Sequence, residues 1–424
     1  MKDRQRILVI SNNSFSETSS NGKTMLSFFS SFDEDQVSQL FFKDEVPTFV
    51  KFHNYYKLTD KDILLFKKGT HILKSDSFLR ENQQEHKKEL SAKKTSDLLR
   101  IIRELIWKIG PWKNKKLDTW INDFHPNLVF LCAGDSIFSY RIALYIQKKW
   151  NTKLMVYITD DYILPRLSDS LMGSLRRRII RKKMANIISS SDKFFVISKS
   201  MRDSYTKIFD KQGIVLNNAQ DFFQDVSKKI FSDKEISLVY AGGLHSKRYE
   251  TLISLKDSIE RFNEDSTKKA KLYIYSNPNV DTTIIDSLSG RYSKFCGLVD
   301  KGQLIQILNS CTIPVFVESF DLEAIESTRL SLSTKISEYL SLNKPILAIG
   351  PAYISSMIVL RDAAYCITDI SKISEKLNEL LNNEMLQNQL RNKSKELYLK
   401  DFNKEDILIR FKNEINSTIL EGED

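Results

Sequence analysis

The chain has 424 residues, of which 41% are hydrophobic and 28% are charged, and its formal net charge at pH 7 is +10. This length predicts two domains, because single hydrophobic cores stop growing beyond about 250–300 residues. No run of 18 or more apolar residues occurs, which argues against a membrane-spanning helix. The first residues enter a strand without a small-residue cleavage site, so no signal peptide is predicted and a cytoplasmic location is expected.

The charge is distributed unevenly along the chain. Residues 1–222 hold 38 Lys and Arg against 25 Asp and Glu, whereas residues 223–424 hold 26 against 29. The first half is therefore the half that we expect to face an anionic partner. The four cysteines are scattered, and neither Cys-x-x-Cys nor His-x-x-x-His occurs, so neither a disulfide framework nor a zinc or other metal site is predicted.

Short runs of β-branched and aromatic residues alternate with helical patterns along the chain, which predicts an α/β fold with parallel sheets. The expected strands are 6–11, 127–132, 153–158 and 193–198 in the first half, and 236–241, 271–276, 312–317, 345–349 and 364–367 in the second. Each set suffices for one doubly wound, Rossmann-like domain. Two such domains facing a cleft would bind ligands at the carboxyl ends of their strands.

The domain boundaries follow from these elements. We expect an N-terminal domain at 1–222 and a C-terminal domain at 223–400, joined through the polar linker 217–235. Helical patterns follow at 371–398 and 404–420. The segment 401–424 is expected to contain a helix that packs back on the N-terminal domain.

The sequence NGKT at 21–24 looks like the end of a phosphate-binding P-loop. The full motif needs a glycine five residues before Gly22, where this chain has Glu17, so a nucleotide hydrolase of that type is excluded. Gly22 stays a candidate for close approach of the backbone to a ligand. No G-x-G-x-x-G motif occurs either, which weakens a nicotinamide or flavin dehydrogenase.

A short helix is predicted to begin at Ser333, Thr334 and Lys335, with Glu338 one turn further on. Hydroxyl side chains cap helices, and a helix start offers free N–H groups to an anion. With the charge of Lys335 beside them, these groups suit a diphosphate, and Glu338 suits a ribose diol. A capped helix with an exposed Lys–Glu pair explains the same pattern, so both interpretations stay open on spacing alone.

Two further segments carry groups suited to a nucleotide diphosphate. At 238–252 a strand leads through two glycines into a basic helix start, and at 315–329 a carboxylate follows a strand end and an arginine precedes the next helix. Glycines allow close approach of a backbone to phosphate. The candidate residues are Gly242, Gly243, Lys247, Arg248, Glu318 and Arg329. His245, in the same turn, is interpreted as structural, because it has no partner in the sequence pattern.

The segments VYITDD, SDKFFVISKSM, LNN, YAGGL…KR and STKISEYLSLNKPILAIGP together make the chain resemble retaining GT-B glycosyltransferases (group 1, family 4-like) of bacterial capsule, exopolysaccharide and cell-wall synthesis. The resemblance covers nearly the whole chain. It implies a metal-independent transferase without a cofactor, with a nucleotide sugar, preferably a UDP-sugar, on the C-terminal domain. It also implies a glycan acceptor, of the lipid-linked kind, on the N-terminal domain.

The resemblance also implies residue roles. Lys247 and Arg248 would contact the donor diphosphate, as would Ser333, Thr334 and Lys335, and Glu338 would bind the ribose. Many relatives have a second glutamate eight positions earlier, where this chain has Leu330. Either Glu318 supplies that carboxylate near the transferred sugar, or sugar recognition differs here.

Two adjacent carboxylates, Asp160 and Asp161, follow the predicted strand 153–158. Relatives often have a His or Asp near the reacting sugar at this place, so both are candidate catalytic residues. An Asp that caps the next helix is the equally open alternative. Asp135 is similarly placed after the strand 127–132 and is similarly ambiguous.

Two basic stretches explain the charge asymmetry. Residues 176–183 contain six cations, and residues 93–116 mix Lys and Arg with Leu, Ile, Trp107 and Trp112 in a helical pattern. Basic amphipathic helices suit an anionic membrane surface, and the alternative is a core helix with a solvated basic face. We expect a peripheral protein at the inner face of the cell membrane. No nucleic-acid partner is expected, because no RNA- or DNA-binding signature accompanies the cations.

Two other functions fit a GT-B chain. One is a non-catalytic subunit that binds glycan and stabilises a partner transferase, and the other is a nucleotide-sugar epimerase. The intact STKISE and GGLHSKR segments argue against the non-catalytic subunit, because a degenerate copy should lose its donor-site cations first.

Overall fold

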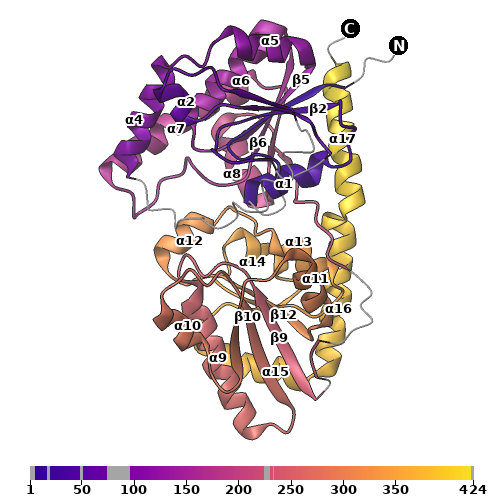
Figure 1. Cartoon of the computed structure of the whole chain (residues 1–424). Helices are drawn as coiled ribbons and strands as arrows, with labels where there is room; N and C mark the ends of the chain where they lie inside the picture. The colour runs from indigo at the N-terminus through magenta and orange to yellow at the C-terminus, as the bar shows by residue number, and fades with distance from the viewer. Residues whose placement is uncertain are drawn as a thin grey trace. The chain divides into compact units, whose positions relative to one another are not determined.

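The structure is a computed structural model that describes residues 5–16, 20–47, 51–73, 96–223, 230–232 and 234–421. The chain divides into two compact units (Figure 1): unit 1 comprises Met1–Asn218 and Leu408–Asp424, and unit 2 comprises Ala219–Ile407. Three sequence features lie outside the described residues: Glu17, the start of the basic stretch at Lys93, and the middle of the predicted linker.

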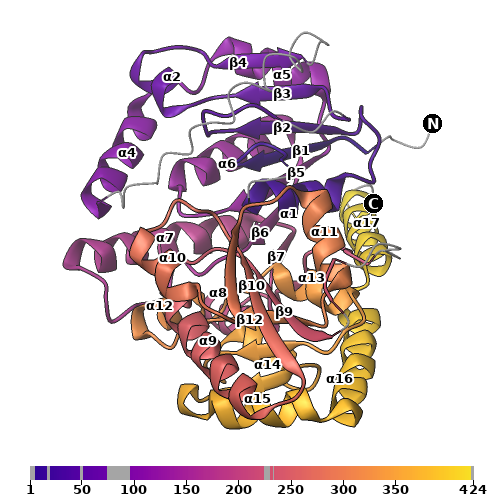
Figure 2. The ribbon, with the colours of Figure 1, turned by 60° about the horizontal axis from the view of Figure 1, so that its bottom comes forward.

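Unit 1 contains an eight-stranded sheet in the order β4-β3-β2-β1-β5-β6-β7-β8 (Figure 2). All its neighbouring strands are parallel except β3 and β4, which pair antiparallel. The strands are β1 (Ile7–Ser11), β2 (Val37–Phe41), β3 (Asn54–Lys57), β4 (Thr70–Leu73), β5 (Leu128–Ala133), β6 (Lys153–Ile158), β7 (Lys193–Val196) and β8 (Ile214–Val215). The predictions of β1, β5, β6 and β7 are confirmed, whereas β2, β3, β4 and β8 were not predicted.

The helices of unit 1 are α1 (Ser20–Phe29), α2 (Asp60–Leu64), α4 (Asp97–Ile109), α5 (Lys115–Phe124), α6 (Ile137–Trp150), α7 (Leu171–Ser190) and α8 (Lys199–Phe209). Residues from Leu408 onward in α17 (Lys404–Leu420) also belong to this unit. Phe411 of α17 is fully buried, and its ring contacts Phe28, Phe29 and Phe130 at centroid distances of 5.3, 5.3 and 5.5 Å. This helix therefore completes the aromatic core of unit 1.

Unit 2 contains a six-stranded parallel sheet in the order β11-β10-β9-β12-β13-β14. Its strands are β9 (Glu235–Ala241), β10 (Lys269–Tyr275), β11 (Ser293–Gly297), β12 (Ile313–Val317), β13 (Leu347–Ile349) and β14 (Tyr365–Ile367). All but β11 were predicted. The central strands β9, β12 and β13 are buried on both faces, as near-continuous apolar runs require, whereas β10 is buried at alternate positions.

The helices of unit 2 are α9 (Arg248–Asp265), α10 (Thr282–Leu288), α11 (Lys301–Ser310), α12 (Leu322–Thr328), α13 (Lys335–Ser341), α14 (Ser355–Leu360), α15 (Ile373–Asn382) and α16 (Glu384–Leu397). The single helical pattern at 371–398 is thus two helices, because Asn383 ends the first and caps the second through Leu386 N at 2.9 Å.

Both units are doubly wound, Rossmann-like α/β domains, which confirms the predicted fold class. The strand order reverses beside β1 in unit 1 and beside β9 in unit 2, and ligands bind at the carboxyl ends of the strands at such switch points. Of the helices that the structure describes, none is long and apolar enough to cross a membrane.

Candidate functional site

The carboxyl end of β9 leads into the Gly242-Gly243 turn, and two side chains fill the space that these glycines leave. A Cβ on Gly242 would lie 2.5 Å from Lys335 Nζ, and a Cβ on Gly243 would lie 2.5 Å from His245 Nδ1. Both distances are far below van der Waals contact. Glycine is therefore required at both positions for a lysine and an imidazole to approach the backbone this closely.

Lys335 reaches this turn from the first residue of α13. The helix is tied to β9 by Tyr339, a buried residue whose hydroxyl accepts from Ala241 N at 3.3 Å. The Lys335 ammonium lies 5.9 Å from the centroid of the Tyr240 ring, and the Tyr240 hydroxyl donates to Gly243 O at 2.7 Å. The structure thus brings Lys335, Gly242 and Gly243 together, as the sequence predicted for a donor site.

Arg248 and Glu318 form a buried ion pair with two hydrogen bonds. Arg248 Nε donates to Glu318 Oε2 at 2.8 Å and Nη2 donates to Oε1 at 3.1 Å, and the two residues are 8% and 4% exposed. Glu318 follows β12, and Arg248 begins α9. Because both carboxylate oxygens are bound by the guanidinium, the geometry favours a positioning role for Glu318 over direct contact with a transferred sugar.

The remaining guanidinium nitrogen of Arg248, Nη1, lies 2.8 Å from His245 Nε2. Burial, followed by the positive charges of Arg248 and Lys335, lowers the pKa of His245 to about 4. This imidazole is therefore neutral at pH 7. His245 thus lies near Arg248 and Lys335, two of the cations that the sequence offered for phosphate binding, although the sequence pattern suggested a structural residue.

Lys247 and Arg329 have different surroundings from Lys335. Lys247 is half exposed, lies in the left-handed region with φ of 56°, and forms an ion pair with Asp321 at 2.5 Å. Arg329 ends α12, and its carbonyl accepts from Ser355 N at 2.9 Å. Lys247 therefore stands at the rim of the turn, whereas Arg329 connects α12 to α14.

The residues at the start of α13 are placed as follows. Thr334 is the N-cap residue, and its side chain makes no cap hydrogen bond. The backbone N–H of Ser333 donates to Ser356 Oγ at 3.3 Å. Glu338 is 5% exposed and lies in the first turn. The predicted hydroxyl cap is therefore absent at Thr334, which leaves that hydroxyl unused by the helix backbone.

In unit 1, Asp160 and Asp161 differ although they are neighbours. Asp161 is 1% exposed, and its Oδ1 accepts from Ile163 N, Leu164 N and the Tyr205 hydroxyl at 3.1, 3.0 and 3.0 Å. Asp161 therefore holds the loop after β6. Asp160 is partly exposed and accepts from the Tyr162 hydroxyl at 3.3 Å, so it is the more accessible of the two candidate catalytic carboxylates.

Other predicted residues of unit 1 lie at the same edge of its sheet. Asp135, after β5, accepts from Arg176 at 2.6 Å. Gly22 lies in the first turn of α1 and is buried. A cavity of about 450 Å³ opens at the carboxyl ends of β1, β2 and β3, and its lining residues are Asn12, Asn13, Phe42, Lys43, Asp44, Thr59, Asp60, Lys61 and Arg103.

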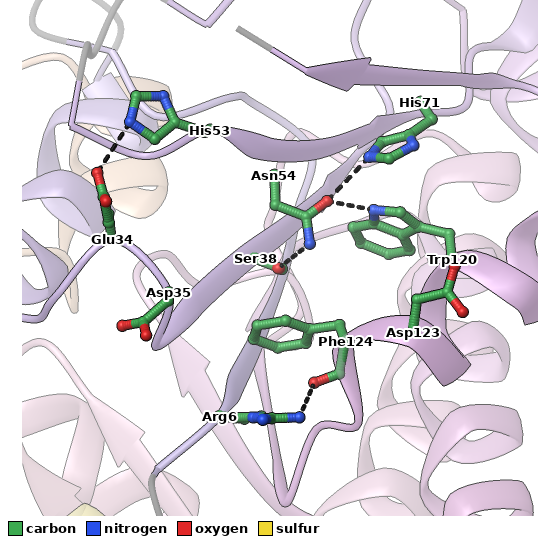
Figure 3. Close-up of a pocket in the computed structure, with 10 residues that line it drawn as sticks. All are labelled: Arg6, Glu34, Asp35, Ser38, His53, Asn54, His71, Trp120, Asp123 and Phe124. Atoms are coloured by element: carbon green, nitrogen blue, oxygen red, sulfur yellow. Dashed lines mark hydrogen bonds and ion pairs between the residues drawn. The ribbon is translucent and has the colours of Figure 1, made fainter.

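A second cavity, of about 440 Å³, lies at the amino ends of the unit 1 strands (Figure 3). Asn54 is central to it, since its Oδ1 accepts from Trp120 Nε1 at 2.5 Å and lies 3.0 Å from His71 Nε2. Arg6 Nη1 donates to Phe124 O at 3.2 Å on the opposite side. Because this cavity is at the other edge of the sheet, it is separate from the predicted site residues.

The two tryptophans of the basic stretch are core residues, which corrects the expectation that they belong to a membrane-facing stripe. Trp107 is fully buried, stacks on Phe138 with a centroid distance of 3.8 Å, and donates to Asp60 Oδ1 at 2.6 Å. Trp112 is also buried and contacts Tyr145 edge-on. An amphipathic pattern alone could not say which apolar face is covered.

The basic stretch on α7 is likewise only partly available. Arg176 and Arg177 form ion pairs with Asp135 and Asp169, and their side chains are 13% and 15% exposed. The four exposed cations are Arg178, Arg181, Lys182 and Lys183.

Within the described ranges, no group of three or more His, Cys, Asp or Glu side chains has the arrangement of a metal site.

No family model and no curated protein matches the sequence, whereas solved structures match over nearly the full length. An E. coli structure, described as trehalose-6-phosphate bound with UDP-2-fluoro glucose, has a TM-score of 0.61 at 9% identity, and the alignment covers 98% of this chain and 99% of that chain. TarM has a TM-score of 0.62 at 12% identity, with 98% and 99% covered.

An α,α-trehalose-phosphate synthase (UDP-forming) from Burkholderia xenovorans, in complex with glucose-6-phosphate, has a TM-score of 0.59 at 10% identity, with 97% of this chain and 100% of that chain covered. At such identities the similarity concerns the fold. These neighbours are GT-B glycosyltransferases, so the two Rossmann-like units of this chain constitute a GT-B fold.

Proposed function

We propose that the protein is a glycosyltransferase that moves a sugar from a nucleotide sugar, most simply a UDP-sugar, to a glycan acceptor. The observation that carries the proposal is the approach of Lys335 to Gly242 at the switch point of unit 2. An ammonium packed against a glycine turn can meet a diphosphate that lies close to the backbone. The GT-B fold supports this proposal, because a structural neighbour of the same fold contains UDP-2-fluoro glucose.

The chemistry proposed for this site needs stabilisation of the leaving diphosphate. Negative charge develops on the phosphate oxygens as the bond to the sugar breaks, and positioned cations and N–H groups stabilise it. Lys335 is the main cation in this scheme, and Ser333 and Thr334 supply hydroxyl donors. Glu338 binds the ribose diol. We propose that transfer proceeds without a metal ion and with retention of the anomeric configuration.

The acceptor is proposed to bind unit 1. Its cavity of about 450 Å³ at the carboxyl ends of β1, β2 and β3 is lined by amide, carboxylate and cationic side chains, which suit the hydroxyl groups of a sugar. Asp160 is the proposed carboxylate of this unit, because Asp161 is occupied by the loop that it holds.

A membrane-surface location is proposed from α4 and α7, which contact each other within unit 1 (Figure 1). Exposed apolar side chains recur on one side of each helix, with exposed fractions that reach 85% at Ile109 and 92% at Leu171. They are Leu98, Ile102, Leu105 and Ile109 on α4 and Leu171, Leu175 and Ile179 on α7.

The exposed cations of α7 lie on the same helix as its exposed apolar residues. This combination suits the surface of an anionic bilayer, where apolar side chains insert and cations contact headgroups. We therefore propose a peripheral enzyme at the cytoplasmic face of a membrane, acting on a lipid-linked glycan of a surface polysaccharide such as a capsule.

The experiment that tests the function is incubation of the purified chain with a panel of nucleotide sugars, with and without membrane extracts that contain lipid-linked glycans. Release of free nucleotide together with a glycosylated product is expected. An epimerised nucleotide sugar without transfer would identify an epimerase instead. Binding of glycan without either product, at any donor, would support a non-catalytic subunit. The anomeric configuration of the product, read by NMR, tests retention.

A further inference from the structure

We propose that His245 is a donor-binding residue whose Nδ1–H donates a hydrogen bond to the diphosphate beside Lys335, and that Arg248 and Glu318 fix the imidazole tautomer for this contact. The inference rests on the proposed function, because it concerns the same turn of unit 2. It changes two sequence-based interpretations: His245 becomes a binding residue, and Glu318 becomes a positioning residue.

The tautomer of His245 follows from hydrogen-bond chemistry. A guanidinium has only donors, so the 2.8 Å contact between Arg248 Nη1 and His245 Nε2 requires Nε2 to be the acceptor. A neutral imidazole whose Nε2 is unprotonated carries its hydrogen on Nδ1. The His245 side chain therefore offers one N–H donor, at Nδ1.

Arg248 can hold His245 in this state because Glu318 holds Arg248. The two bonds from Nε and Nη2 to the Glu318 carboxylate fix the plane of the guanidinium, and Thr251 Oγ1 donates to Glu318 O at 2.9 Å. The Glu318 backbone N–H donates to Ile349 O at 2.8 Å. The chain of contacts from β13 through Glu318 and Arg248 to His245 is thus continuous.

The Nδ1 side of the imidazole faces the turn where Lys335 also lies. The nearest atoms to a Cβ built on Gly243 are His245 Nδ1 and Cε1, at 2.5 and 2.7 Å, and the nearest atoms to a Cβ built on Gly242 belong to Lys335. Each of the two adjacent glycines thereby lets one donor approach the backbone, a charged one at Gly242 and a neutral one at Gly243. Protein atoms surround much of the His245 ring, which lowers its pKa, but the residue keeps an exposed surface that a ligand at the turn can reach.

A neutral donor in this place has a physical advantage. Protonation of Nε2 would set an imidazolium against the Arg248 guanidinium, and burial, followed by this repulsion, lowers the pKa of His245. The N–H of His245 is therefore present throughout the neutral range, and its contribution to donor binding should not depend on pH there.

The test uses the full chain labelled with 15N-histidine, with His245 assigned from the spectrum of the His245→Ala variant. Long-range 1H–15N NMR of the free protein should show Nδ1 protonated and Nε2 unprotonated from pH 6 to pH 8. Titration with UDP should shift the Nδ1 resonance, whereas uridine should not. The Glu318→Gln variant should retain the fold and show mixed tautomers at His245.

Calorimetry supplies the second readout. His245→Ala should weaken UDP binding by roughly tenfold, since a lost hydrogen bond to a charged group has about this effect, and should leave uridine binding unchanged. His245→Gln should recover part of the loss, because its amide both accepts and donates. The matched control is His125→Asn, which changes an exposed histidine of unit 1 with a left-handed backbone that asparagine tolerates.

Three outcomes would overturn the inference. An Nε2–H tautomer in the free protein would show that Arg248 does not fix the ring. An unmoved Nδ1 resonance, or unchanged UDP affinity in His245→Ala, would remove only the His245 contact while the donor site remained. Absence of binding by the wild-type chain to UDP and to other nucleoside diphosphates would refute the proposed function itself, and the contact with it.

Discussion

In each unit, some strand ends carry a charge opposite to the net charge of that half of the sequence. The second half of the chain has the net negative sequence, yet its sheet edge gathers Lys335, Arg248 and Lys247. The first half is strongly basic, yet the ends of β5 and β6 present Asp135, Asp160 and Asp161, and four of its exposed cations lie on α7. The two proposed anionic ligands, a diphosphate in unit 2 and an extended anionic surface at the helices of unit 1, therefore rest on the local placement of cations and not on net charge.

The largest expected effect concerns that surface. Changing Arg178, Arg181, Lys182 and Lys183 to Gln should weaken binding to anionic vesicles by about 4 kcal/mol, since each cation contributes about 1 kcal/mol near an anionic leaflet. The measurement is vesicle flotation at low salt. The matched control removes four exposed lysines of unit 2, by changing Lys372, Lys393, Lys395 and Lys400 to Gln, and should bind as the wild type does. Equal flotation of the wild type with anionic and neutral vesicles would contradict the proposed location at an anionic membrane surface.

A buried carboxylate of unit 1 should make its stability depend on pH. Burial raises the pKa of Glu104 to about 7, against the opposing charge of Arg141 and the Ile137 N–H bond at 2.7 Å. The pKa of Glu104 is therefore higher in the folded than in the unfolded protein. Its contribution to the free energy of unfolding is complete below pH 4.5 and is lost as the pH rises to 7. The loss is about 3 kcal/mol. Glu104→Gln should flatten the pH dependence of the unfolding free energy measured in urea, and an unchanged slope would contradict the assignment.

The proposed diphosphate site of unit 2 is tested by Lys335→Ala. Affinity for UDP should fall by about 1.5–3 kcal/mol, the usual contribution of a charge-assisted hydrogen bond, while affinity for uridine stays unchanged because it has no phosphate. Calorimetry measures both. Lys301→Ala, at an exposed lysine of the same unit, is the control. If Lys335→Ala weakened the binding of both ligands equally, the start of α13 would have no specific role in phosphate binding.

Glu338 should act on the other part of the nucleotide. Glu338→Gln keeps the side-chain shape and one acceptor oxygen, so the loss should be near 1.5 kcal/mol, the low end for a bond to a charged group. UDP and uridine should weaken by the same factor, since both contain the ribose. A loss of affinity confined to UDP would show that Glu338 acts at the phosphates and not at the ribose.

The smallest expected effect is that of chelation. If side chains stabilise the leaving diphosphate, transfer should proceed at an unchanged rate in excess EDTA. A fall to background that magnesium or manganese reverses would show that the cations of unit 2 do not act alone.

Strands with long apolar runs were predictable from the sequence, and those with polar residues were not. β9 and β12 are buried on both faces, and their apolar sequences predict this burial. β2 reads Val-Ser-Gln-Leu-Phe, and its Gln39 is buried only because its amide donates to Ser11 Oγ at 2.8 Å and its carbonyl accepts from Phe15 N at 2.8 Å. No local pattern signals such a distant partner.

For the candidate site too, residues within one local motif were predictable from the sequence, and contacts between distant segments were not. Lys335 and the two glycines were identified from motifs within one segment each. The pairing of Arg248 with Glu318 joins residues 70 positions apart. The sequence offered each of them as a ligand-binding group, because only the fold shows that the two neutralise each other. The only local signal for His245 was its place three residues before Arg248, which puts both side chains at one helix start.

The position of Phe411 in the core of unit 1 has a consequence for synthesis on the ribosome. Residues 1–218 emerge first, but the pocket between Phe28, Phe29 and Phe130 stays open until α17 has been translated. During that interval the whole of unit 2 is made, and an aromatic cavity of the nascent chain faces solvent or a chaperone. The unit that is translated first is therefore the unit that finishes folding last.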